Sequence, residues 1–221
     1  MYLKLILCYV KKENQPEFTE RQAAWNAISE VEGLIFQLGG WNTPEGEIAL
    51  KLALWENEEL YGEFHRNIHD AMAQKAGHQH LYYKIETAFF HLLPNEHPGR
   101  NLREVIGNSS FLRVADCRVH PEHADHFLKV QQHVWIPAMQ QDGHMQGGFF
   151  SRHATEENRF LVASFWTDRE GHEGYATRSV PLLREKTNVK ETISELKGYH
   201  VNLLPEWKAT GAAIGSCSTG F

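Results

Sequence analysis

The chain repeats itself once, with a period of about 110 residues. Sliding the sequence along itself by this distance brings landmarks into coincidence in the same order. The matching pairs are Cys8 and Cys117, Phe18 and Phe127, Gly33 and Gly143, Trp55 and Trp166, and the Leu-Leu-Pro triplets at 92–94 and 203–205. Repeats that stack into solenoids are much shorter, roughly 20–50 residues. Each half is therefore predicted to be a small domain, and two similar domains in one chain predict a pseudo-symmetric pair.

The repeat also sets the predicted domain boundaries. The first repeat covers residues 1–94 and the second covers residues 111–205. Residues 95–110 between them carry proline and glycine and are predicted to be a linker. The tail, residues 206–221, ends in glycine, alanine, serine and threonine and is predicted to be loose.

Hydrophobic patterning gives both halves the order strand, helix, strand, strand, helix, strand. The elements predicted in the first half are strands 2–10, 34–41, 47–55 and 84–93 and helices 17–32 and 57–75. Those predicted in the second half are strands 111–119, 145–152, 159–166 and 197–204, helix 123–139 and a helix that opens at Thr167. This order is that of the ferredoxin-like fold, an antiparallel sheet with both helices on one face. The other sheet face needs a cover, and the second sheet can supply it. The predicted fold class is therefore α+β, two tandem ferredoxin-like repeats forming an intramolecular barrel.

Local signals mark where several of these elements begin and end. Gly33 is predicted to end the first helix, and Asn57 to cap the second. Thr167 and Glu170 have the spacing of a capping box, and Pro137 is expected to disturb the last turn of helix 123–139. The turn-forming residues 42–46 predict a hairpin loop.

Composition excludes several classes of function. The formal net charge of −6 and the isoelectric point near 6.2 argue against nucleic acid, which calls for a basic face. No apolar run approaches the roughly 18 residues of a membrane span. The apolar stretch Met1–Val10 is interrupted by Lys4 and fits a strand better than a signal peptide. Three cysteines without a CxxC pair predict reduced thiols in a cytoplasmic protein. Nucleotide-binding and hydrolase motifs of the GxGxxG, GKS/T, GxSxG and HExxH types are absent from the sequence.

The passage from the third strand of each half into the following helix carries a family resemblance. In the first half Trp55 ends the strand, Asn57 follows as a capping residue, and Phe64 comes nine residues after the tryptophan. Trp166 and Tyr175 repeat this spacing in the second half. The pattern resembles the antibiotic-biosynthesis-monooxygenase group of the dimeric α+β barrel superfamily, and its tandem form is similar to a bacterial family of unknown function.

The resemblance implies a small-molecule monooxygenase that needs no metal, flavin or other cofactor. Haem-degrading members of the superfamily use an asparagine, a tryptophan and a histidine. The aligned positions here are Ile6 and Ala115, Phe64 and Tyr175, and Gln74 and Glu185, so all three residues are missing from both halves. Haem degradation by that mechanism is therefore not expected. Haem binding through another histidine, such as His65 or His91, stays open.

Asymmetry between the halves places the predicted site in the second one. Tyr175 stands where the first half has Phe64, and His133 has no counterpart near Trp25. We therefore predict His133 and Tyr175 as catalytic residues. The residues predicted to bind substrate are Trp135, Trp166, Asn202, His91, Trp25, Phe64 and His65. The alternative is that the aromatic residues are core and that His133 and Tyr175 face solvent.

The remaining polar candidates also have two interpretations. His65 and His69 are four residues apart on a predicted helix, but two ligands are too few, so no metal site is predicted. His91 and Asn202 occupy equivalent positions on strands expected to be buried, either as a hydrogen-bonded core pair or as groups that project into a pocket.

Three functions follow as hypotheses. The first is oxygenation of a small aromatic or quinol-type compound without a cofactor. The second is a non-catalytic barrel that binds a small apolar ligand, and the third is haem binding. The predicted partners are a small apolar or aromatic ligand and a second copy of the tandem barrel, without nucleic acid or membrane.

Overall fold

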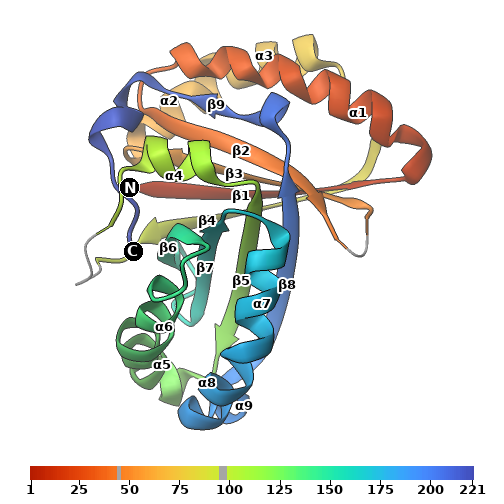
Figure 1. Cartoon of the computed structure of the whole chain (residues 1–221). Helices are drawn as coiled ribbons and strands as arrows, with labels where there is room; N and C mark the ends of the chain where they lie inside the picture. The colour runs from red at the N-terminus through yellow and green to blue at the C-terminus, as the bar shows by residue number, and fades with distance from the viewer. Residues whose placement is uncertain (44–45, 95–98) are drawn as a thin grey trace. The chain divides into compact units, whose positions relative to one another are not determined.

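The computed structural model describes residues 1–43, 46–94 and 99–221. These residues form two compact units, which Figure 1 shows in one colour ramp. Unit 1 comprises Met1–Phe89 and Val201–Cys217, and unit 2 comprises Phe90–His200 and Ser218–Phe221. Part of the predicted hairpin loop, at 44–45, and part of the predicted linker, at 95–98, lie outside the described residues.

Unit 1 is built on an antiparallel sheet. Its elements are β1 (Tyr2–Val10), α1 (Gln15–Gln22), β2 (Leu34–Asn42), β3 (Ile48–Trp55), α2 (Glu58–Asn67), α3 (His69–Ala76), the first part of β4 (Tyr82–Leu92) and the short β9 (Ala209–Thr210). The strand order β4-β1-β3-β2 is that of a ferredoxin-like unit, with β9 beside β2. Leu5 lies opposite Leu52 in the register of β1 and β3. The helices α1, α2 and α3 lie on one side of this sheet (Figure 1).

Unit 2 repeats the arrangement. Its elements are α4 (Leu102–Asn108), β5 (Phe111–Val119), α5 (Ala124–Val130), α6 (Ile136–Gln140), β6 (Met145–His153), β7 (Arg159–Trp166), α7 (Arg169–Arg178), α8 (Val180–Thr187), α9 (Val189–Thr192) and most of β8 (Ile193–Leu203). The strand order β6-β7-β5-β8 matches that of unit 1, and the end of β4 pairs with β6. The observed class is the predicted one, α+β with two ferredoxin-like repeats in tandem.

The cap and stop signals of the first half are confirmed. The side chain of Asn57 accepts a hydrogen bond of 2.9 Å from the backbone N–H of Leu60. Gly33 has a φ of 79°, and a Cβ there would lie 2.6 Å from the side chain of Leu60, so only glycine fits. In the second half the capping prediction is wrong in one respect. Asp168, not Thr167, caps the helix, because its carboxylate accepts from the N–H of Gly171 at 2.7 Å.

The predicted first helix of each half is broken into segments. In unit 1, α1 passes into 3₁₀ turns over Ala23–Glu30. In unit 2, α5 is followed by a π-helical turn, Gln131–Trp135, before α6. Pro137 is the second residue after this turn, and its nitrogen cannot donate a hydrogen bond to a preceding carbonyl, which accounts for the irregular hydrogen bonding. Turns of this type often occur at functional sites.

The predicted loose tail is wrong. Within residues 206–221, Trp207 is buried in unit 1 against Phe18, with 5.9 Å between ring centroids. Phe221 is buried in unit 2 and exchanges two backbone hydrogen bonds with Gly148, at 2.8 and 3.2 Å. Small residues at the end of a chain favour disorder, but two aromatic side chains anchor this one.

The predicted linker also contains regular structure. Residues 102–108 form α4, and the side chain of Asn101 caps it by accepting from the backbone N–H of Arg103 at 3.0 Å. The buried residues of this helix are Leu102, Val105 and Ile106. An apolar stripe of three residues at helical spacing therefore turns much of the segment into part of the unit 2 core.

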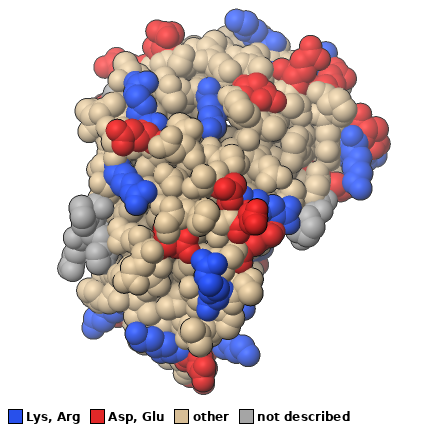
Figure 2. Space-filling view, in the orientation of Figure 1, with Lys and Arg blue, Asp and Glu red and all other residues tan. Residues whose placement is uncertain are grey.

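Charged residues of both signs are interspersed on the face of the molecule that Figure 2 draws. On this face, lysines and arginines lie among aspartates and glutamates. No helix within the described part of the chain is long and apolar enough to cross a membrane.

Candidate functional site

Each unit holds a cavity lined by its own sheet and helices. The cavity of unit 1 has a volume of about 340 Å³ and that of unit 2 about 140 Å³. Matching positions of the repeat line both cavities, because alternate residues of each strand point to the same face. The matched lining residues are Cys8 and Cys117, Trp25 and Trp135, Trp55 and Trp166, and Phe64 and Tyr175.

Two buried lysines distinguish the cavity of unit 1. Lys4 on β1 and Lys51 on β3 are 9% and 5% exposed. The ammonium of Lys4 donates to the Tyr61 hydroxyl at 3.0 Å, and that of Lys51 donates to the side-chain oxygen of Gln22 at 3.0 Å. The described residues that line this cavity include no aspartate or glutamate. Two positive groups therefore face one cavity without an acidic partner among its described lining residues.

Burial perturbs the ionisable groups around this space. It lowers the pKa of Lys4 to about 8, and the neighbouring charge of Lys51 lowers it further in the same direction. Burial also lowers the pKa of Lys51. It raises the pKa of Tyr61 to about 12 and lowers that of His78 to about 4. An anionic ligand would relieve the unfavourable environment of both ammonium groups.

Several buried polar atoms beside the lysines have no hydrogen-bond partner among the described residues. They are the indole N–H groups of Trp25 and Trp55, the Nδ1 atom of His78 and the side-chain nitrogen of Gln22. A buried polar group without a partner costs about 1–3 kcal/mol. The three that belong to Trp25, Trp55 and His78 line the cavity and are available to a ligand that carries hydrogen-bonding atoms.

Aromatic rings form the rest of the wall. Trp55 and Phe64 stack with 4.9 Å between centroids, and Lys51 lies 5.6 Å from the ring centroid of Trp25. His65 stacks on Tyr61 at 5.9 Å. The structure thus brings together Trp25, Phe64 and His65, which the sequence nominates as substrate-binding residues.

The structure divides the site residues predicted in the second half into two groups. Trp135, Trp166 and Tyr175 line the cavity of unit 2, whereas His133 is exposed and is not part of its lining. His133 lies in the π-helical turn, whose inward side presents Gln131 and Trp135 instead.

The prediction that His91 and Asn202 are buried is wrong. Both lie on strands, β4 and β8, but both are exposed. Their neighbours Phe90 and Val201 are fully buried, because successive strand residues point to opposite faces. Neither His91 nor Asn202 contributes to either cavity.

Sequence reasoning missed Lys4, Lys51, Gln22 and Tyr61 as site residues. A usable signal was present for the two lysines. Each interrupts a strand whose other residues are almost all apolar, and such a lysine is rarely buried unless it has a role. The part played by Gln22 depends on how the helix packs on the sheet, which the pattern of one sequence does not specify.

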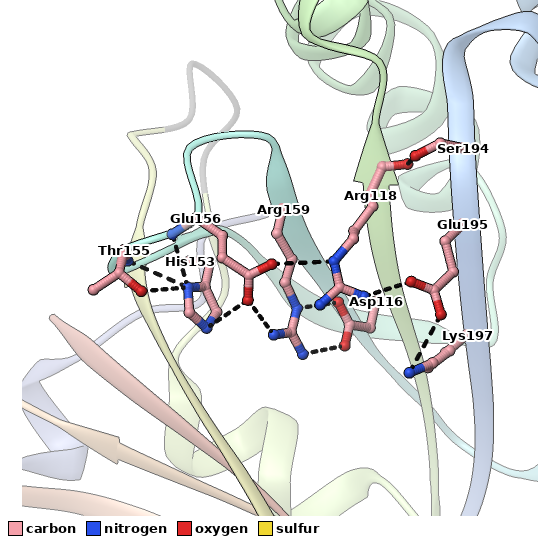
Figure 3. A network of polar contacts seen from close by, with 9 residues as sticks. All are labelled: Asp116, Arg118, His153, Thr155, Glu156, Arg159, Ser194, Glu195 and Lys197. Carbon is pink, nitrogen blue, oxygen red and sulfur yellow. Dashed lines mark hydrogen bonds and ion pairs between the residues drawn. The ribbon is translucent and has the colours of Figure 1, made fainter.

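A network of charged side chains in unit 2 is the other polar cluster (Figure 3). Arg159 donates to both oxygens of the buried Asp116 carboxylate, at 2.9 and 2.7 Å. Glu156 accepts from Arg159 at 2.8 Å and from Arg118 at 3.1 Å, and Arg118 also pairs with Glu195. Every charge in this network has a partner of opposite sign. The network therefore joins neighbouring strands, and none of its charged groups is left to bind a ligand.

Metal binding lacks a suitable cluster. Among the described residues, no three histidine, cysteine, aspartate or glutamate side chains are placed to hold one ion. His65 and His69 lie 4.7 Å apart by ring centroids and both line the unit 1 cavity, but the other lining residues offer no carboxylate to join them.

Sequence comparison finds relatives of the first half. A profile for the family described as "Domain of unknown function (DUF4937)" matches residues 2–90. The "Uncharacterized protein YdbC" of Bacillus subtilis (strain 168) is 32% identical over 92 residues, which are 41% of this chain and 77% of that protein. The matched region coincides with the main segment of unit 1 and includes both buried lysines.

Structural comparison finds solved structures whose fold is similar to that of the whole chain. A candidate monooxygenase from Lactobacillus acidophilus NCFM has a TM-score of 0.68 and 12% identity, with 95% of each chain covered. A second, from Fusobacterium nucleatum, has a TM-score of 0.73 and 10% identity, with 95% of this chain and 94% of the other covered. An anthrone oxidase-like protein has a TM-score of 0.63 and 13% identity, with 95% and 92% covered. These similarities confirm the predicted fold class, α+β with two ferredoxin-like repeats in tandem.

Proposed function

The chain belongs to the family described as "Domain of unknown function (DUF4937)", and we propose that its unit 1 cavity binds and oxygenates a small aromatic compound with an ionisable oxygen. The observation that carries this proposal is the pair of buried lysines, Lys4 and Lys51, in a cavity whose described lining has no carboxylate. Burying an ammonium group without a counter-charge destabilises a fold, so the pair is best explained by a ligand that supplies the negative charge.

The size and lining of the cavity support an aromatic ligand. Its volume of about 340 Å³ lies at the lower end of the usual range for small-molecule sites. Trp25, Trp55 and Phe64 offer flat apolar surfaces to a ring. An oxygen on that ring would interact with the ammonium groups of Lys4 and Lys51 and the indole N–H of Trp55, which all lie on the strands of the sheet.

The lysines fit the chemistry of an oxygenation that requires only the substrate and O₂. With its pKa near 8, Lys4 is partly neutral at physiological pH and serves as the base that takes the proton from the substrate. Lys51 stabilises the resulting oxyanion, because a fixed charge that is buried interacts strongly with it. The electron-rich ring carbon then reacts with O₂.

The reaction balances with one substrate and one O₂. One O–H bond and one C–H bond of the substrate break: the O–H oxygen becomes a carbonyl, and the ring carbon becomes a second carbonyl that carries one oxygen atom from O₂. The second oxygen atom leaves with the two hydrogens as water. Two neighbours of similar fold are described as candidate monooxygenases and another as anthrone oxidase-like, which supports this class of reaction by analogy of fold.

A panel of phenols, quinols and anthrones tests the proposal. Binding is followed by tryptophan fluorescence and oxygenation by O₂ consumption, in the full chain and in Lys51→Met. We expect the variant to lose binding and turnover while a control variant, Lys84→Met, keeps both, because Lys84 is exposed on β4 and pairs with Glu86. Unchanged binding in Lys51→Met would contradict the proposal. Tight, lysine-dependent binding without O₂ consumption would leave the cavity as a non-catalytic ligand site.

A further inference from the structure

We infer that the cavity of unit 2 is a second and separate binding site, for a single-ring aromatic carboxylate held by Arg113. All of its lining residues belong to unit 2, and none is shared with the cavity that contains the two lysines. The inference does not depend on the proposed oxygenation.

Arg113 provides the positive charge of this site. It projects from β5 into the cavity, and its guanidinium donates to the backbone carbonyl of Val114. A Cβ at Gly198 of β8 would lie 2.7 Å from a guanidinium nitrogen, so glycine at this position makes room for the group. Within the described residues, no carboxylate forms an ion pair with Arg113. Arg184 adds a second positive charge to the lining, which includes no described acid.

Three buried polar atoms without a described partner surround the same space. They are the indole nitrogen of Trp135, the Nδ1 atom of His172 and the hydroxyl of Tyr175. Tyr175 is 3% exposed, so solvent does not satisfy its hydroxyl. A carboxylate would accept hydrogen bonds from the indole N–H and the hydroxyl as well as from the guanidinium. The cavity therefore offers several hydrogen-bond donors to a single carboxylate.

The rest of the lining is apolar and sets the size of the ligand. The residues that form it include Met139, Val162, Val180 and Ile193. A volume of about 140 Å³ is close to the roughly 150 Å³ of a cavity that is known to hold benzene. The cavity therefore has room for one aromatic ring.

The planar fork of a guanidinium favours a carboxylate in particular. Arginine binds carboxylates through two parallel hydrogen bonds, which a lysine cannot do. Unit 1 has Lys4 at the position that Arg113 occupies in unit 2, so the two cavities suit different oxygens. Burial also lowers the pKa of Arg113 to about 10, and a bound carboxylate would reverse that effect.

Calorimetry with benzoate and its neutral isostere benzamide tests the site in the full chain at pH 7. We expect benzoate to bind at least about 10-fold more tightly than benzamide, because only benzoate forms the charge-assisted pair. Arg113→Met should weaken benzoate binding by about 10-fold or more. Arg103→Met, an exposed arginine on α4, should leave it unchanged. Lys51→Met should also leave it unchanged, because Lys51 lies in the other unit.

Tyr175→Phe keeps the test decisive if Arg113→Met fails to fold. This change removes one hydroxyl that has no partner within the described structure, so the variant should fold normally and bind benzoate about 3- to 10-fold more weakly. Equal affinity for benzoate and benzamide would overturn the inference. So would benzoate binding that is lost in Lys51→Met and kept in Arg113→Met, or no benzoate binding at millimolar concentration.

Discussion

The two cavities keep the same frame and differ in charge. Both are lined by a cysteine and two tryptophans at matching positions of the repeat, and these residues are buried or half-buried in each unit. Lys51 of unit 1, however, is matched by Val162 of unit 2, and Lys4 is matched by Arg113. Residues that serve the fold are thus retained in both units, while the charged residues differ. The differing positions are the ones from which function is best inferred.

The largest expected effect on stability comes from removing Trp207, the residue that anchors the C-terminal segment in unit 1. Trp207 packs among the rings of Phe18 and Trp41 and donates its indole N–H to the backbone carbonyl of Thr19 at 3.1 Å. Trp207→Ala should lower the free energy of unfolding by about 3–5 kcal/mol, as for other buried aromatic residues. Chemical denaturation measures this. A loss below about 1 kcal/mol would show that the tail is loose, as the composition predicts.

Making unit 1 resemble unit 2 is the next test. Lys51→Val introduces the residue found at the matching position and should weaken binding of an ionised phenol by about 10- to 100-fold. The same variant should melt at a higher temperature, because a buried ammonium without a counter-charge is replaced by an apolar side chain. Differential scanning calorimetry and fluorescence titration measure the two effects. Weaker binding together with a lower melting temperature would instead indicate a structural role for Lys51.

The pH dependence of stability sharpens the comparison further. The pKa of Lys4 is about 8 when folded and 10.5 for the unperturbed group, so the unfolded chain binds more protons between these values. Lys4 should therefore contribute a rise of roughly 2 kcal/mol to the free energy of unfolding between pH 8 and 10. Lys4→Met should flatten this rise, and Lys84→Met should preserve it. Above pH 10 the raised pKa of Tyr61 opposes the trend, because Tyr61 then ionises more readily in the unfolded chain.

The smallest expected effect compares two tyrosines. Tyr61→Phe removes the hydroxyl that accepts from Lys4, so it should destabilise the fold by about 1–2 kcal/mol. Tyr175→Phe removes a hydroxyl without a partner among the described residues, so it should change stability by less than about 0.5 kcal/mol or stabilise slightly. Urea denaturation of both variants measures the difference. Equal losses would show that the Tyr175 hydroxyl has a partner in solution.

Much of the fold could be predicted from the sequence because the signals are local and occur twice. The strands Tyr2–Val10 and Arg159–Trp166 match their predicted ranges closely, since apolar runs and flanking turn residues define them. The predictions failed where tertiary packing decides the outcome. The tail is anchored by Trp207, and the linker forms α4, although composition favours a loop for both.

The site was only partly predictable. Tryptophans such as Trp25 and Trp166 do line the cavities, because a strand or helix face that is apolar in the sequence faces the interior. His133 was chosen for asymmetry between the halves and Asn202 for its place on a strand expected to be buried, and neither observation tells which way a side chain points. Lys51 lies on a strand whose other residues are apolar, and the structure buries it with them. It was not predicted as a site residue, because lysine side chains usually lie on the surface.

The most direct test of the central claim is the ionisation state of a phenol bound to unit 1. A chromophoric phenol such as 4-nitrophenol has distinct absorbance bands for the phenol and the phenolate. With buried ammonium groups at Lys4 and Lys51, the account predicts that the protein binds the phenolate and lowers the pKa of the ligand by at least about one unit. Lys51→Met should remove most of this shift. A bound phenol whose pKa is unchanged or raised would contradict the account, because the cavity would then be acting as an apolar pocket alone.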